Sequence, residues 1–248
     1  MAATFPENDL NRARTSEPVF NIPGIILVLT GICIVAFLAQ NYVLDDQQNL
    51  WVMINFAFWP VRFSQGGGFD DPAAWMTAIT YSFMHGGFAH IAVNLVWLAA
   101  FGSPLAGRIG TTRMIIFWIA TAIAAAFTHY ALHPESAMPL VGASGSISGM
   151  MGAAARYGFR RVPDMLHQKG KSEFAGPLLP IGVTLTLRPV LAFLGVWFVI
   201  NLVTGLISIT PTESASIAWE AHIGGFIVGF FGIALLDRPS PLDAPRPY

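Results

Sequence analysis

The sequence is short of charge and of cysteine. Only 11% of its 248 residues are charged, and the formal net charge is −1. A near-neutral chain offers no overall field for nucleic acid, which speaks against nucleic-acid binding. The single cysteine, Cys33, cannot form an intrachain disulfide. The chain also has no internal repeat, no phosphate-binding Walker loop and no dinucleotide motif, so nothing in it points to nucleotide chemistry.

Hydrophobic residues, by contrast, make up 54% of the chain. This is too apolar for a soluble domain, and the charges lie in clusters separated by uncharged stretches about as long as a bilayer is thick. We therefore expect an all-α polytopic membrane protein, with a polar cytoplasmic tail over 1–22, a membrane domain over 23–237 and a short C-terminal tail over 238–248. The expected spans cover residues 21–44, 87–107, 114–132, 144–155, 189–212 and 221–236, and a long interfacial loop covers 45–86.

Basic residues are distributed unevenly between the segments that join these spans. All but Arg62 of the 13 Lys and Arg residues fall on one side when the chain crosses the membrane six times. The loops over 133–143 and 210–220 contain no Lys or Arg. Because basic residues are retained on the cytoplasmic side, the sequence predicts six transmembrane helices with both termini inside.

The stretch LVGASGSISGMMGA, residues 140–153, interrupts the apolar pattern with glycines and serines. Pro139 and Gly142 disfavour a continuous helix, so we expect the fourth helix to begin near Ser144, partway across the membrane. Irregular backbone at that depth has to line a cavity, because lipid cannot hydrogen-bond open amides. The first-turn amides, among them that of Gly145, form an anion site. A hydroxyl beside them fits a serine nucleophile with an oxyanion hole.

A serine nucleophile needs a base, and the chain has six histidines. Ionisable residues at membrane depth are costly and usually functional, which singles out His85, His90 and His222. His222 begins span six on the same predicted side as Ser144. The remaining histidines are interpreted as ordinary interfacial or loop residues: His129, His133 and His167.

Glycines repeat at a spacing of four residues in spans four and six. The pairs are Gly145 with Gly149, and Gly225 with Gly229. Small residues at this spacing allow two helices to approach with almost touching backbones. Such an approach would bring the histidine of span six within hydrogen-bond reach of the serine of span four.

His90 and Asn94 lie four residues apart on one face of span two, where they are placed to donate to a developing oxyanion. Three histidines at membrane depth also fit a second class, a six-span transporter or channel that binds a metal or lines a path. No carboxylate accompanies them at that depth, however, and the segment around Ser144 would then have no role.

Three motifs together resemble the rhomboid intramembrane serine proteases. They are HGGFAHIAVN at 85–94, GASG at 142–145 and AHIGGFIVG at 221–229, on spans two, four and six. The resemblance covers residues 23 to about 237 and implies a rhomboid-like six-span fold in the bacterial cytoplasmic membrane. It implies hydrolysis of a peptide bond in or near a transmembrane segment of a membrane-protein substrate, through an acyl-enzyme and without a metal or cofactor.

The resemblance also implies roles for individual residues. Ser144 is the nucleophile and His222 the general base of a dyad. His90, Asn94 and Gly145 stabilise the oxyanion. Residues expected to be structural near the site are His85, Gly142, Gly225 and Gly229.

Two positions depart from the pattern of the family that the chain resembles. Met76 follows Trp75 where many members have arginine, which removes the usual anchor of the first loop. Ser148 stands where some members place an aromatic residue beneath the catalytic histidine, so we expect Ser148 or packing alone to orient His222. A non-proteolytic relative that only binds membrane helices is a further alternative. Such proteins usually lack a dyad member, whereas both are present here.

Overall fold

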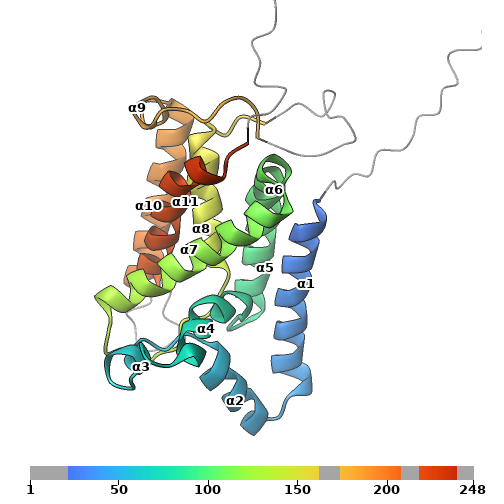
Figure 1. Cartoon of the computed structure of the whole chain (residues 1–248), viewed down its shortest axis with the longest axis vertical. Coiled ribbons are helices and arrows are strands. Elements are labelled where there is room, and N and C mark those ends of the chain that lie inside the picture. The colour runs from blue at the N-terminus through green and yellow to red at the C-terminus, as the bar shows by residue number, and fades with distance from the viewer. Residues whose placement is uncertain (1–21, 162–173, 208–217, 239–248) are drawn as a thin grey trace, which may run out of the picture.

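The computed structural model describes residues 22–161, 174–207 and 218–238, and these residues form a bundle of helices (Figure 1). Strand pairing among the described residues is limited to two isolated bridges, Phe58 with Leu140 and Arg161 with Phe174. The predicted all-α class is confirmed. The expected tails lie almost entirely outside the described residues.

Five helical segments of the bundle are long and apolar enough to cross a membrane. The first is α1, Gly24–Leu38, continued by a π-helical turn over Ala39–Val43. The second joins α5, Phe88–Trp97, to α6, Ser103–Ile109, through another π-helical turn, Leu98–Gly102. The others are α7, Thr111–Leu132, α10, Arg188–Ile207, and α11, Trp219–Leu236.

Helix α8, Ser144–Arg156, is the shortest of the predicted spans and lies within the bundle, among α5, α7, α10 and α11 (Figure 1). Every residue of α8 after Ser144 is buried. Its 13 residues rise about 20 Å, less than the roughly 30 Å of a hydrocarbon core. Counting α8 gives the six spans of the sequence analysis; that number and the orientation remain predictions.

The connection over 45–86 differs from the expected loop, because most of it is helical. It contains α2, Asp46–Phe56, α3, Pro60–Ser64, and α4, Pro72–Thr80, followed by a 3₁₀ turn, Tyr81–Phe83. These short helices gather at one end of the bundle (Figure 1).

Local capping explains why these helices form. Asp45 accepts from the Gln48 N–H and the Gln48 side chain accepts from the Asp45 N–H, which makes a reciprocal capping box at the start of α2. Asp71 caps α4, where Pro72 occupies the first helical position. Both start signals are present in the sequence, at Asp45 and at Asp71 with Pro72.

Helices α8 and α11 pack with their backbones in direct contact. A Cβ added to Gly225 would overlap the carbonyl of Gly145, and one added to Gly229 would overlap the carbonyl of Gly149. No residue larger than glycine fits at either position of α11 without displacing α8. This contact brings the first turn of α11 beside the first turn of α8.

Candidate active site

Ser144 and His222 are hydrogen-bonded to each other. Ser144 is the first residue of α8, as the sequence predicted, and His222 lies in the first turn of α11. The distance between Ser144 Oγ and His222 Nε2 is 2.8 Å. Ser144 and His222 are both partly accessible, whereas most of the residues next to them in α8 and α11 are buried. The arrangement places a hydroxyl beside an imidazole that is able to accept its proton.

The other ring nitrogen of His222 is held by a residue that the sequence analysis did not single out. Asn201 Oδ1, on α10, lies 2.5 Å from His222 Nδ1. Asn201 is buried, and its Nδ2 donates to the carbonyl of Trp197 at 2.7 Å. The amide nitrogen is thereby engaged within α10, which leaves the amide oxygen to face the imidazole. This network favours the tautomer with the proton on Nδ1 and a free lone pair on Nε2.

Asn201 shows that span five contributes a polar side chain to the site. It is the one amide residue in the otherwise apolar sequence VLAFLGVWFVINLV. Its presence in an apolar span was the available signal, because a polar side chain at membrane depth usually finds a partner. Ser148, the partner expected from the sequence, is buried one turn below Ser144, and both ring nitrogens of His222 are engaged by other residues.

The backbone before Ser144 is irregular and lies against span two. Gly142 has φ of 124°, a conformation that favours glycine, and its N–H donates to the Tyr81 carbonyl at 3.0 Å. A Cβ at Gly142 would lie 2.7 Å from His90 Nε2 and 3.7 Å from Asn94 Nδ2. The structure therefore places His90 and Asn94 against the segment that leads into Ser144.

Hydrogen-bond donors remain available around this segment. Asn94 is 4% exposed, and among the described residues its Nδ2 has no hydrogen-bond partner. The first hydrogen bond across the start of α8 runs from the Ile147 N–H to the Ala143 carbonyl. The N–H groups of Ser144 and Gly145 precede it, so the helix itself offers them no acceptor. Such unpaired donors beside a hydroxyl can stabilise a developing negative charge.

His85 contacts His90. Its ring meets the His90 ring edge-on, with 5.1 Å between ring centroids. It is buried in the connection that leads into α5, and burial, reinforced by the neighbouring His90, lowers the pKa of His85 to about 4. A neutral His85 supports His90 by packing, in line with the structural role that the resemblance implied.

The connection that carries α2–α4 is anchored without an arginine at position 76. Met76 is exposed, whereas Arg62 pairs with Asp71 at 2.5 Å across the start of α4. The N–H of Ala73 and the guanidinium of Arg62 lower the pKa of the Asp71 carboxyl, so the pair is charged at neutral pH. Trp75 adds a hydrogen bond from Nε1 to the carbonyl of Phe69.

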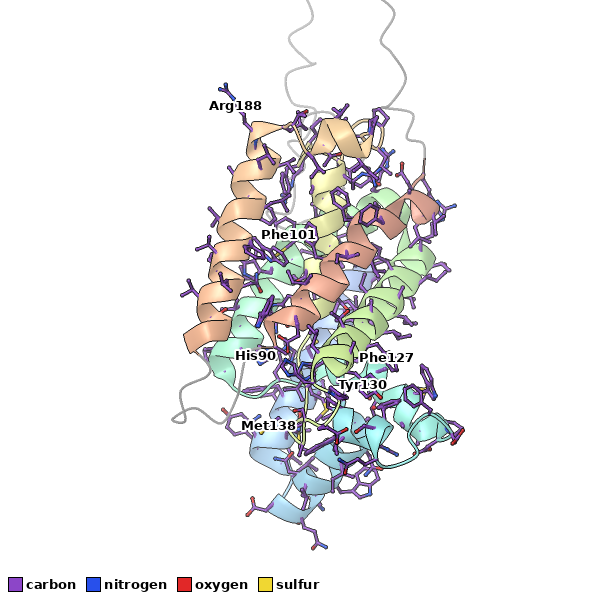
Figure 2. The ribbon with its side chains drawn as sticks, turned by 90° about the vertical axis from the view of Figure 1, so that its left-hand side faces the viewer. His90, Phe101, Phe127, Tyr130, Met138 and Arg188 are labelled. Carbon is purple, nitrogen blue, oxygen red and sulfur yellow. The ribbon has the colours of Figure 1, made fainter. Side chains whose placement is uncertain are left out.

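The site lies at the end of the bundle where α2–α4 gather. Figure 2 shows His90 on α5 and Tyr130 on α7 at this end, with Arg188 at the opposite end of α10.

The apolar helices and the buried short helix α8 define an integral membrane protein, and the family model of the Rhomboid domain matches residues 72–238. That match covers more than half of the chain, so the chain belongs to the rhomboid family.

Several relatives are named rhomboid proteases. The chain is 26% identical over 205 residues to Rhomboid protease GlpG of Serratia proteamaculans, an alignment that covers 83% of this chain and 60% of the relative. It is 25% identical over 205 residues to Rhomboid protease GlpG of Haemophilus influenzae, covering 83% and 86%. Rhomboid protease GluP of Bacillus subtilis is 27% identical over 168 residues, which are 66% of this chain and 27% of the relative.

Proposed function

We propose that this protein is an intramembrane serine protease that hydrolyses a peptide bond in or near a transmembrane segment of its substrates. The 2.8 Å hydrogen bond between Ser144 Oγ and His222 Nε2, at the irregular start of a membrane helix, is the observation that carries the proposal. The names of the relatives give the same reaction class. The relatives' bacterial sources favour the inner membrane as its location.

In the first half of the reaction, Ser144 Oγ attacks the scissile carbonyl carbon while His222 Nε2 takes the hydroxyl proton. The resulting tetrahedral intermediate carries a negative oxygen. Its collapse breaks the C–N bond, and His222 returns the proton to the leaving amine. The product is an acyl-enzyme on Ser144. In the second half, His222 deprotonates a water molecule that releases the new carboxyl end and restores the serine.

The negative oxygen of the intermediate needs donors that are already in place. The N–H groups of Ser144 and Gly145 supply two, and Asn94 Nδ2 and the ring of His90 lie beside the same segment. Donors fixed by the fold require no reorganisation during the reaction, and removal of one typically costs about 2.7 to 4 kcal/mol of barrier. The unpartnered Asn94 amide is the donor best suited to this role among the side chains described here.

Asn201 acts as a positioning residue in this mechanism. By accepting from His222 Nδ1–H it keeps the imidazole plane directed at Ser144, and the bond persists when the ring becomes protonated. An asparagine fills the same place beside the histidine in papain-like Cys-His-Asn sites. The aromatic residue missing at position 148 is thereby replaced by a hydrogen bond from another helix.

The test is cleavage of a single-span reporter by the purified protein in liposomes, beside Ser144→Ala and His222→Ala. We expect cleavage and labelling by a serine-reactive fluorophosphonate in the wild type, and neither in the Ser144→Ala variant. A folded wild type that neither cuts nor labels would instead favour a non-proteolytic relative that binds membrane helices.

A further inference from the structure

A second cluster of ionisable side chains lies outside the proposed catalytic groups. His129 is in the last turn of α7, His133 follows directly after that helix, and Glu220 is the second residue of α11. Glu220 Oε1 lies 2.7 Å from His129 Nδ1 and 3.1 Å from His133 Nε2. One imidazole from the last turn of α7 and one from the residue directly after it thus converge on one carboxylate oxygen of α11.

The burial of this cluster is uneven. The side chain of Glu220 is 5% exposed and that of His129 is 11% exposed, whereas that of His133 is 53% exposed. A buried carboxylate at the start of a membrane helix is costly unless positive charge or a metal neutralises it. The exposed side of His133 leaves the cluster open to solvent on one side. A small cation can therefore reach the carboxylate from outside the bundle.

The geometry suits a transition metal better than a hard cation. The rings of His129 and His133 both contact Glu220 Oε1, and two histidines with one glutamate form a recurrent ligand set for zinc. The three ligand atoms all lie within 4.8 Å of one another. Ligand atoms around tetrahedral zinc are separated by about 3.3 Å. Side-chain rotations that move the ligand atoms by about 1 Å would therefore bring them to this spacing. Nitrogen ligands exclude Mg²⁺ and Ca²⁺ as the preferred occupants.

We propose that His129, His133 and Glu220 bind one zinc ion, with water in the fourth position. Bound zinc would join the end of α7 to the beginning of α11, two residues before His222. Its role is to fix the first turn of α11, and it takes no part in the proposed peptide-bond chemistry. The interpretation of His129 and His133 as ordinary interfacial residues is revised by this proposal.

The experiment uses full-length Ser144→Ala protein in detergent, so that its result does not depend on proteolysis. After stripping with a chelator and removal of the chelator, the protein is titrated with Zn²⁺ alone. Bound metal is counted by mass spectrometry after desalting, and thermal unfolding is followed in parallel. We expect one Zn²⁺ per chain and a rise in Tm on addition of Zn²⁺.

Variants locate the ion. His133→Ala, at an exposed side chain, should fold normally and lose both the bound Zn²⁺ and the rise in Tm. Glu220→Gln should lose them as well, while the matched control His167→Ala, far from the cluster in sequence, should retain them. Absence of Zn²⁺ binding to the folded parent protein would overturn the proposal and leave a histidine–glutamate ion pair. Binding that survives in His133→Ala would overturn it too, since the ion would then occupy other histidines.

Discussion

Asn201 Oδ1 lies 2.5 Å from His222 Nδ1, so a side chain of α10 holds the histidine of α11. Its own Nδ2 is fixed to the Trp197 carbonyl, which prevents the amide from rotating away. The base of the proposed dyad is therefore oriented from two sides, by a serine in α8 and by an asparagine in α10. This relationship makes α10 part of the site as well as a wall of the bundle.

Replacing Asn201 should slow turnover without preventing substrate binding. Loss of a buried hydrogen bond costs about 1 to 3 kcal/mol, so Asn201→Ala should lower kcat roughly 5- to 150-fold while KM changes little. Asn201→Asp keeps the acceptor oxygen and should recover most of the rate. Val203→Ala, at an exposed residue of the same helix, is the matched control. An unchanged kcat in Asn201→Ala would show that the hydrogen bond does not position His222.

Turnover should fall in acid with the titration of a single group. His222 must be neutral to accept the Ser144 proton, and protonation fills the lone pair on Nε2. Below the apparent pKa of the site, each pH unit should therefore lower kcat/KM about tenfold, with a plateau above it. The profile is measured with the reporter in liposomes equilibrated on both sides. A rate that stays level across the range where histidines titrate would remove His222 from the role of general base.

Asn94→Ala should lower activity without lowering stability. Its Nδ2 has no partner among the described residues, so truncation breaks no hydrogen bond of the resting enzyme that the structure contains. If this group binds the oxyanion, kcat should fall about 100- to 1000-fold, equivalent to about 2.7 to 4 kcal/mol. Thermal unfolding should shift little. A marked drop in Tm together with the drop in kcat would indicate that Asn94 has a packing role instead.

Enlarging the α11 glycines should destabilise the bundle. In Gly225→Val the new side chain would collide with the backbone of α8 at Gly145, and overpacking of this kind costs about 1 to 3 kcal/mol. Activity should fall with it, since the collision separates α8 from α11. Gly195→Val on α10 is the control, because nothing lies within 4 Å of a Cβ at Gly195. Comparable unfolding of both variants in detergent would contradict the close contact.

The parts of the fold that depend on local signals were predictable. The start of α8 at Ser144 follows from Pro139 and Gly142, which break an otherwise uncharged run. The long spans follow from the positions of the charge clusters. The short helices of the connection were not predicted although Asp45 and Asp71 carry recognisable cap signals, because helices of 9 and 11 residues are too short to show a clear apolar period.

Two tertiary contacts, that of Asn201 with His222 and that of His129 with Glu220, were not predictable from the sequence. Asn201 and His222 are 21 residues apart on different helices, and an asparagine in an apolar span is equally consistent with bonding back to its own helix. His129 and Glu220 are 91 residues apart. Nothing local to either residue indicates the other, since their meeting depends on how α7 and α11 cross.

The length of α8 sets the depth in the membrane at which the proposed reaction takes place. In the proposed topology this helix rises about 20 Å from one membrane boundary, so Ser144 lies roughly 10 Å short of the opposite one. A substrate helix has to lose about two turns, at 5.4 Å per turn, before its backbone carbonyl can descend to that level. Segments that unwind readily at their outer end would then be cut, and stably wound ones spared. A thinner membrane would shorten the distance that the substrate carbonyl has to move into the membrane, and would therefore reduce the preference for substrate segments that unwind readily.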